Sequence, residues 1–240
     1  MDKSEKKCLI ISGGEYDDIF REDTGFACGV SLPEEGSGKC AESYNDNTGY
    51  DLILACDRGL DHALAMGLAP DTVLGDLDSV SAGGKKYLET QDIRCIRFPR
   101  EKDDTDTMAA IMHALKLGYR HIDMICAYGG RRDHEFGNIQ AAFHAAARGA
   151  VVRLLADGTE TVIFSSGSIK LKKRPGYGFS VFALSDECLG VYIRNARYEL
   201  NDARMTNDSP RGVSNEFTAP EAEISVEKGV LMTMTVRLTG

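Results

Sequence analysis

Three acidic clusters each come directly after a short apolar segment in the first half of the chain. They are ACDRG (55–59), GDLDS (75–79) and KDDTD (102–106). Carboxylates at this density repel one another unless a positive charge lies among them. Oxygen ligands of this kind suit Mg²⁺, which takes one or two carboxylates and leaves its other positions to water and substrate phosphates. The clusters therefore indicate magnesium-assisted chemistry on a phosphorylated substrate.

Each cluster alone also has a purely structural interpretation. Asp76 and Asp78 would point to the same side of an extended segment, but a D-x-D pair in a loop is common. The 103–106 run could simply cap a helix, and Asp57 with Arg58 could be a surface ion pair. Their joint occurrence after successive apolar segments favours a shared site.

A fourth cluster, GGRRDH (129–134), is followed by Asn138. Glycines free the backbone, and the guanidinium of Arg131 could bind a phosphate through two hydrogen bonds. A turn followed by a helix cap explains the same residues equally well. The chain has neither a phosphate-loop lysine motif nor G-x-G-x-x-G, so a bound nucleotide would be held by acidic residues and metal.

The elements that must position these clusters alternate between strand and helix. Short apolar runs at 8–12, 52–55, 73–74, 93–98, 122–127 and 151–156 predict strands. Residues 105–117 and 137–148 have helical apolar periodicity. This alternation predicts a parallel sheet covered by helices, with the carboxyl ends of its strands at one crevice where ligands bind.

The pattern changes after about residue 158. Short runs of alternating apolar residues, separated by turn residues such as Gly167 and Gly229, predict a small all-β sandwich. We therefore expect an α/β fold with two domains. These are a Rossmann-like α/β domain (1–157) and a smaller β-sandwich domain (158–240).

Composition narrows the function classes. The 240 residues are 42% hydrophobic and 27% charged, as in an ordinary globular protein. A net charge of −9 argues against nucleic-acid binding. No apolar run is long enough for a membrane span or a signal peptide, so we expect a cytoplasmic protein with no membrane partner.

Taken together, the motifs resemble those of the thiamine pyrophosphokinases (thiamine diphosphokinases). ACDRG, PDTVLGDLDS, KDDTDT and GGRRDHEFGN occur in the order and spacing of that family, and GVSNEF (212–217) resembles its serine–asparagine signature. The resemblance covers roughly residues 50–145 and 175–238. It implies transfer of diphosphate from ATP to the thiamine hydroxyl, giving thiamine diphosphate and AMP. It also implies that residues 1–157 form the catalytic domain that binds ATP and magnesium, and that residues 158–240 form the thiamine-binding domain.

The resemblance also implies roles for individual residues. Those expected to be catalytic are Asp76, Asp78, Asp106, Arg131 and Asp133, the first three as ligands of Mg²⁺. Those expected at ATP are Asp57, Arg58, Lys102, Asp103 and Thr105. Those expected at thiamine are Asp133, His134, Ser214 and Asn215.

The family is typically a homodimer with shared active sites, in which Ser214 and Asn215 would come from the partner subunit. Some members stack a tryptophan on thiamine; this chain has no tryptophan, so Phe217 or a tyrosine would have to serve. Two other functions remain open from the residues. One is a magnesium-dependent nucleotide hydrolase, and the other is a thiamine or nucleotide sensor without turnover.

Overall fold

The computed structural model describes residues 6–17, 49–98 and 104–238. These residues form two compact units. The first comprises the described residues up to Ala141 together with Leu155–Asp157, and the second comprises Ala142–Leu154 and the described residues from Gly158 on. Helix α4 (Arg132–Ala146) and strand β6 (Val151–Ala156) contribute residues to both units.

The first unit is built on parallel strands. These are β1 (Lys7–Ile11), β2 (Leu52–Cys56), β3 (Thr72–Gly75), β4 (Arg94–Arg97) and β5 (His121–Ile125). Their order in the sheet is β5-β1-β2-β3-β4, and each neighbouring pair is parallel. Strands β1 and β2 are apolar along almost their whole length because both faces of the sheet are covered.

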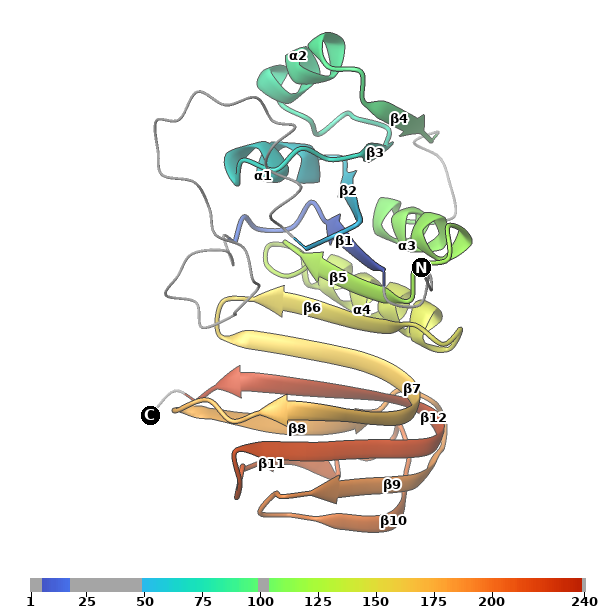
Figure 1. The fold of residues 1–240 in the computed structure, drawn as a ribbon, viewed down its shortest axis with the longest axis vertical. Coiled ribbons are helices and arrows are strands. Elements are labelled where there is room, and N and C mark those ends of the chain that lie inside the picture. The colour runs from blue at the N-terminus through green and yellow to red at the C-terminus, as the bar shows by residue number, and fades with distance from the viewer. Residues whose placement is uncertain (1–5, 18–48, 99–103, 239–240) are drawn as a thin grey trace. The chain divides into compact units, whose positions relative to one another are not determined.

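Helices cover the two faces of this sheet (Figure 1). Helix α1 (Gly59–Ala65) packs through Leu60 and Ala63 on the face that carries Ile53 and Ala55. Helix α3 (Asp106–Lys116) lies against the other face, where the Cys56 thiol is 3.7 Å from the carbonyl oxygen of Asp106. A further helix, α2 (Ala82–Thr90), precedes β4.

Strand β1 lies between β5 and β2, although β5 comes after β4 in the chain. The chain thus runs from β1 outward to β4 and then returns to the other side of β1. The carboxyl ends of β1 and β5 are adjacent at this reversal. In open α/β sheets, such a reversal opens a crevice in which ligands bind.

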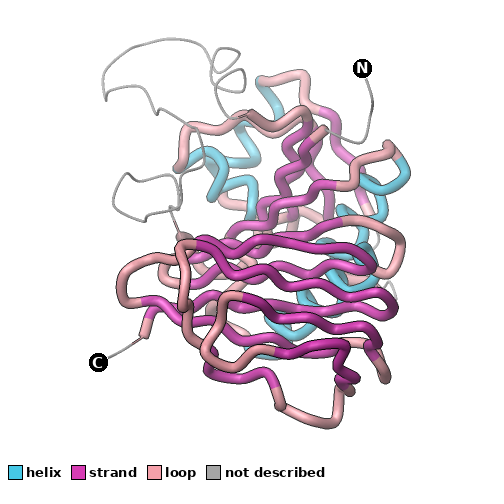
Figure 2. Tube along the Cα trace, turned by 60° about the horizontal axis from the view of Figure 1, so that its bottom comes forward, coloured by secondary structure: helices cyan, strands magenta, loops and turns pink. Residues whose placement is uncertain are grey.

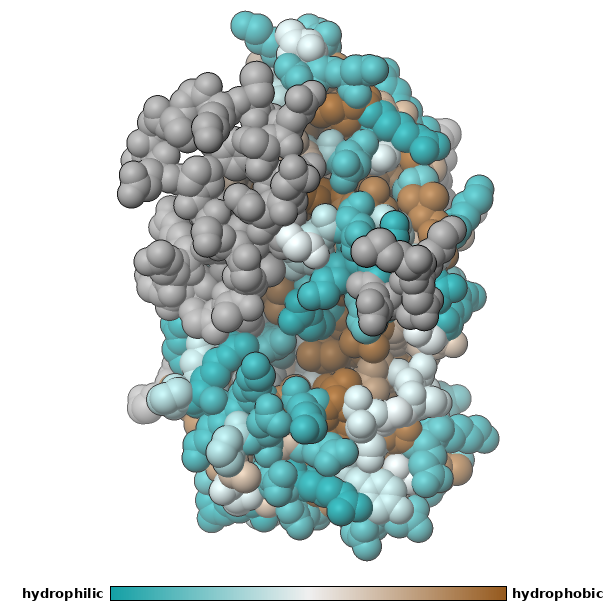
Figure 3. All heavy atoms as spheres, in the orientation of Figure 1, coloured by the Kyte–Doolittle hydropathy of each residue, from teal (hydrophilic) through white to brown (hydrophobic). Residues whose placement is uncertain are grey.

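The second unit is antiparallel. It contains β7 (Thr159–Lys172), β8 (Tyr177–Ala183), β9 (Cys188–Arg194), β10 (Leu200–Met205), β11 (Gly212–Asn215) and β12 (Glu221–Arg237). Figure 2 shows these strands in magenta joined by short turns, and no helix interrupts the stretch from Thr159 to Arg237. The face of this unit seen in Figure 3 is predominantly hydrophilic.

Strand β12 pairs with β7 along its length, and its two halves take different second partners. Residues 223–228 pair with β9, and residues 231–237 pair with β8. One apolar core contains Ile224 from the first half of β12 and Leu231 from its second half. Phe179 of β8 and Val191 of β9 belong to the same core. The predicted order of a parallel α/β domain and a β-rich domain is therefore confirmed. The boundary at 157/158 stays a prediction.

Candidate functional site

A cavity of about 770 Å³ lies in the first unit, at the carboxyl ends of β1, β2, β3 and β5. Its lining includes the following predicted site residues: Asp57, Arg58, Asp78, Thr105, Asp106, Arg131 and His134. Residues from four separate sequence clusters thus meet at one crevice. This convergence is what the strand-end argument predicts.

The end of β2 fixes Asp57 in an unusual backbone conformation. Asp57 has φ 46°, in the left-handed region that costs a residue with a Cβ about 1 kcal/mol or more. Its nitrogen donates to the Leu74 carbonyl oxygen at 2.9 Å, and its Oδ1 accepts from the Leu77 nitrogen at 2.9 Å. Asp57 therefore holds the segment after β3 against the end of β2.

Gly75 makes that contact possible. A Cβ added to Gly75 would clash with the Asp57 carboxylate. The φ of 140° at Gly75 also disfavours any residue other than glycine. The glycine that precedes the D-x-D pair is therefore required by the close approach of Asp57.

The D-x-D segment itself is not extended, in contrast to the geometry that the sequence pattern suggested. Strand β3 ends at Gly75, and Leu77 has φ 64°. Asp76 Oδ1 accepts a hydrogen bond from the Asp78 nitrogen at 3.0 Å. Asp78 lines the cavity, whereas Asp76 is absent from its lining.

Burial and neighbouring carboxylates raise the pKa of Asp57 to about 7. Burial is the largest cause, followed by a hydrogen bond between the Asp57 and Asp106 carboxyls and by the negative charges of Asp106 and Asp76. The Leu77 N–H partly opposes this shift. The site therefore concentrates negative charge, which a cation would offset.

The start of α3 serves both the helix and the cavity. Thr105 Oγ1 accepts from the Met108 nitrogen at 3.1 Å, so the helix-cap interpretation of this residue is confirmed. Thr105 and Asp106 also line the cavity. The buried hydroxyls of Ser12 and Thr107, 3.1 Å apart, link the end of β1 to the first turn of α3.

The loop between β5 and α4 carries Arg131 to the cavity. In this structure the Arg131 guanidinium binds Asp133 through two hydrogen bonds, from Nη2 at 2.6 Å and from Nε at 3.1 Å. This partner holds the pKa of the Asp133 carboxyl below its usual value. Both side chains are largely exposed, and His134 lines the cavity beside them while Asp133 does not.

Several residues of the cavity were not predicted. Ser12, Gly13 and Gly14 come from the end of β1, and Glu15 follows them. The paired glycines after an apolar strand were the available signal, since ligands approach the backbone closely at such turns. Asn138 also lines the cavity; it is buried and donates from Nδ2 to the Ala127 carbonyl oxygen at 2.7 Å.

The predicted thiamine residues of the second unit lie in β11. Ser214 is exposed, and its nitrogen donates to Ser180 Oγ at 3.1 Å. Asn215 is buried, and its amide binds the backbone: Oδ1 accepts from the nitrogens of Tyr198 (3.0 Å) and Glu216 (2.9 Å), and Nδ2 donates to the Tyr198 carbonyl oxygen (2.8 Å). Asn215 thus fixes the neighbouring loop.

The aromatic residues near β11 differ in accessibility. Phe217 is buried, with its ring centroid 4.7 Å from that of Phe179, so it belongs to the core. Tyr198 is 58% exposed, and the Arg197 guanidinium lies 5.5 Å from its ring centroid. Of the two positions, only Tyr198 presents a ring at the surface.

Two predicted ATP residues, Lys102 and Asp103, lie outside the described residues. Within the described ranges, no group of three or more His, Cys, Asp or Glu side chains could hold a metal ion, so Asp76, Asp78 and Asp106 do not form such a group in this structure. The magnesium site therefore stays a prediction. No helix in the described part of the chain is long and apolar enough to cross a membrane; the cytoplasmic location also stays a prediction.

Sequence comparison assigns both parts of the chain to one family. Residues 45–154 match the catalytic domain of thiamin pyrophosphokinase, and residues 167–231 match the vitamin B1 binding domain of thiamin pyrophosphokinase. The chain belongs to the thiamin pyrophosphokinase family. It is therefore a thiamine diphosphokinase enzyme, as the motif resemblance implied.

Individual relatives agree with this family. The thiamine pyrophosphokinase of Bacillus subtilis is 27% identical over 192 residues, which cover 78% of this chain and 90% of that protein. A crystal structure of thiamine pyrophosphokinase from Bacillus subtilis superposes with a TM-score of 0.76 at 23% identity, covering 98% of this chain and 100% of that one.

A more distant relative shows the same fold. Thiamin pyrophosphokinase from Candida albicans has a TM-score of 0.69 at 14% identity, covering 97% of this chain and 89% of that chain. The α/β unit followed by a β-rich unit is thus retained at low sequence identity.

Proposed function

We propose that the chain transfers a diphosphate group from Mg-ATP to the hydroxyl of thiamine, giving thiamine diphosphate and AMP. The observation that carries this proposal is the convergence of Asp57, Asp78, Asp106 and Arg131 on one cavity at the sheet's reversal point. In this transfer, the thiamine hydroxyl oxygen forms a bond to the β-phosphorus and releases its proton to solvent. The bond from that phosphorus to the α,β-bridging oxygen breaks, and AMP leaves with the electron pair.

The residues at the cavity suit a divalent cation. Asp57 and Asp106 share a hydrogen bond between carboxyls, and burial with neighbouring charge raises the pKa of Asp57. Asp76, Asp78 and Asp106 would hold the ion. Within the described residues these three side chains are not arranged as a group that holds a metal ion. Mg²⁺ is usually bound through one or two carboxylates, with water and substrate phosphates at its other positions. When bound, Mg²⁺ neutralises charge that develops on the transferred phosphates.

The remaining groups position the nucleotide. Arg131 has the geometry to bind phosphate oxygens through two hydrogen bonds, and its present partner Asp133 is an exposed carboxylate that a phosphate can replace. Arg58 and Thr105 line the same cavity. We assign Lys102 and Asp103 to the ATP site from the motif alone. Positioning and charge neutralisation are the main requirements of phosphoryl-type transfer.

We assign thiamine binding to Asp133, His134 and Ser214, with Asn215 in a supporting role. Asn215 uses its amide to hold Tyr198, so its contribution to thiamine would be made through that loop. The exposed ring of Tyr198 is the aromatic group of this region that could stack on a thiamine ring. We further propose a homodimer in which the second unit of one subunit completes the site of the other.

The test measures nucleotide products with and without thiamine. With Mg-ATP and thiamine, we expect AMP and thiamine diphosphate in equal amounts, and no consumption of ATP when thiamine is omitted. A nucleotide hydrolase would consume ATP without thiamine, and a sensor would bind ligands without turnover. Formation of ADP and phosphate at a rate independent of thiamine would overturn the proposal.

A further inference from the structure

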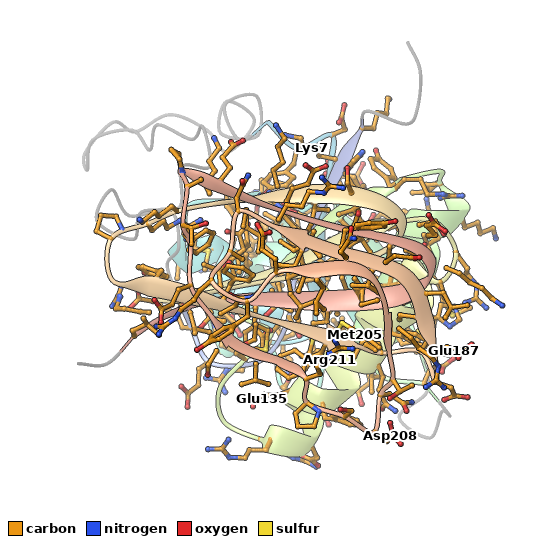
Figure 4. The ribbon with its side chains drawn as sticks, turned by 90° about the horizontal axis from the view of Figure 1, so that it is seen from below. Lys7, Glu135, Glu187, Met205, Asp208 and Arg211 are labelled. Atoms are coloured by element: carbon orange, nitrogen blue, oxygen red, sulfur yellow. The ribbon has the colours of Figure 1, made fainter. Side chains whose placement is uncertain are left out.

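The loop that joins β5 to α4 is held by two side chains of α4 that the proposed reaction does not use. Asn138 Nδ2 donates to the Ala127 carbonyl oxygen at 2.7 Å, and Glu135 Oε1 accepts from the Gly129 nitrogen at 2.8 Å. The two side chains lie three residues apart, on neighbouring positions of one helix face. Glu135 comes from the first turns of α4 (Figure 4).

The segment after β1 holds the same loop from another direction. The Gly14 nitrogen donates to the Cys126 carbonyl oxygen at 2.8 Å, and the Glu15 nitrogen donates to the Tyr128 carbonyl oxygen at 3.0 Å. Each of the residues 126–129 therefore has one backbone group that is hydrogen bonded, either to the segment after β1 or to a side chain of α4. A loop with this much backbone hydrogen bonding has a defined conformation.

The hydrogen bonds to the loop are interrupted at Gly130 and resume at Arg131, whose carbonyl oxygen accepts from the nitrogens of His134 (3.0 Å) and Glu135 (3.1 Å). Gly130 has φ 75°, and a Cβ added to it would meet no atom within 4 Å. Arg131 follows it with a side chain that is 70% exposed. The guanidinium therefore projects from an open point of the loop, and the last fixed group before it is the Gly129 nitrogen bound to Glu135.

Asn138 is not needed to build the helix, whereas the carboxylate of Glu135 in the first turn also favours the helix N-terminus. Asn138 is buried, and burying an amide is unfavourable unless it is hydrogen bonded, so an alanine would pack on that helix face at lower cost. The contacts that both side chains make are with the loop. Asn138 supplies a donor for a loop carbonyl oxygen, and Glu135 supplies an acceptor for a loop N–H.

We propose that Glu135 and Asn138 are positioning residues that fix the β5–α4 loop so that Arg131 meets the phosphates of the nucleotide. This inference rests on the proposed function, because it takes the cavity as the ATP site. Neither residue touches the reacting atoms through the contacts described. A displacement of about 1 Å in a group that orients a substrate can lower the rate about 10²-fold.

The experiment compares Glu135→Ala, Glu135→Gln and Asn138→Ala with the unchanged enzyme, and uses Gln140→Ala as a control at an exposed position of the same helix. It measures kcat, KM for ATP and for thiamine, and the melting temperature of each variant. It also measures the Kd for Mg-α,β-methylene-ATP, whose α,β-bridge resists cleavage. Glu135→Ala and Glu135→Gln are then repeated in the Arg131→Ala background.

We expect Glu135→Ala and Asn138→Ala to lower kcat/KM for ATP about 10- to 100-fold, with an unchanged KM for thiamine. Glu135→Gln keeps an oxygen acceptor for the Gly129 N–H and should stay within about threefold of the unchanged enzyme. In the Arg131→Ala background, the loss caused by Glu135→Ala should shrink to less than about twofold, because coupled residues are not additive. Gln140→Ala should have no effect.

Three results would overturn the proposal. One is equal loss in Glu135→Gln and Glu135→Ala, which would make the charge of Glu135 the important property. The second is full additivity with Arg131→Ala, and the third is a loss confined to melting temperature. If the unchanged enzyme binds the analogue but forms no AMP from ATP and thiamine, the proposed function fails. The Kd values of the variants for the analogue then still decide the role of Glu135 and Asn138.

Discussion

At the scale of single residues, the site depends on strained backbone at strand ends. Asp57, Leu77 and Cys126 all have positive φ and all lie just beyond a strand of the first sheet. Residues with side chains adopt this conformation only where surrounding contacts compensate, and such positions cluster at functional sites. The turn at each strand end directs the following residues toward the cavity.

The residue types that were predictable are those whose chemistry stands out in the sequence. Asp57, Asp78, Asp106 and Arg131 could be placed at one crevice because each follows a recognisable apolar segment. The contribution of Asn138 was not predictable from spacing, since its role depends on a hydrogen bond to Ala127 across a loop. The left-handed turn at Leu77, which separates Asp76 from Asp78, has no sequence signal either.

Replacing Asp78 by asparagine tests the metal at this scale. The change keeps the shape of the side chain but removes a charge from the cavity lining. We expect turnover to fall by roughly 10²-fold or more, because a lost ligand forfeits several kcal/mol of charge stabilisation. The melting temperature without metal should not fall, and the rise produced by adding Mg²⁺ should disappear. AMP formation and thermal unfolding with and without Mg²⁺ are the measurements.

Asp92→Asn is the matched control, since Asp92 is an exposed carboxylate absent from the cavity lining. It should leave both readouts unchanged. Normal turnover in a folded Asp78→Asn protein would remove Asp78 from the metal site.

At the scale of elements, the strong helices and buried strands were predicted, and the errors have identifiable causes. Helix α4 starts at Arg132 and not near 137, because its first turns carry motif residues without apolar periodicity. Helix α2 was not predicted because Gly83 and Gly84 lower its intrinsic helix propensity. Tertiary bonds compensate: Ser81 caps the helix, and Asp61 accepts from the Ser81 hydroxyl at 2.6 Å.

The longest strands each correspond to two of the short apolar runs in the sequence, at 161–164 and 168–171 for β7 and at 223–226 and 231–238 for β12. Gly167 and Gly229 suggested turns, and both have positive φ. The structure carries β7 and β12 through these positions, with a shift in their register between Val226 and Val230. A glycine inside a strand can mark an irregularity of the ladder as well as its end, and sequence pattern alone does not separate the two cases.

Asn215→Ala tests the role of the asparagine within the second unit. Two of its three backbone hydrogen bonds join β11 to Tyr198 in the loop before β10, and the third is to the neighbouring Glu216 nitrogen. Because the variant leaves partly buried backbone groups of that loop without this partner, we expect unfolding free energy to fall by about 1–3 kcal/mol. Urea unfolding is the measurement.

Asn201→Ala, at an exposed position of β10, is the control and should change stability little. If Asn215→Ala instead raised the KM for thiamine with no loss of stability, direct binding to thiamine would be its main role.

At the scale of the whole molecule, the proposed catalytic residues lie in the first unit, whereas the proposed thiamine residues are divided between the first unit (Asp133, His134) and the second (Ser214). The carboxylates and Arg131 belong to the first unit, and Ser214 belongs to the second. The division into an α/β and a β-rich part could be predicted because the apolar period changes near residue 158. The number of subunits that form one site could not be derived from periodicity, since it depends on a surface shared between chains.

Mixing two inactive variants tests the shared site. Asp78→Asn disables the first unit, and Ser214→Arg places a large side chain at an exposed position of the second unit. If each site combines the first unit of one subunit with the second unit of its partner, a heterodimer of the two variants has one intact site and one doubly altered site. Random exchange of equal amounts makes half of the dimers mixed, so about a quarter of normal activity should return.

Each variant incubated alone at the same total concentration is the control and should stay inactive. Subunit exchange is verified independently by differently tagged chains that co-purify after mixing. If both units of one chain form the site, every site in the mixture carries one altered residue, and activity stays at the level of the separate variants. If subunits demonstrably exchange and no activity returns, a site shared between subunits is excluded. The magnesium and nucleotide assignments would then still be tested by the Asp78→Asn measurements.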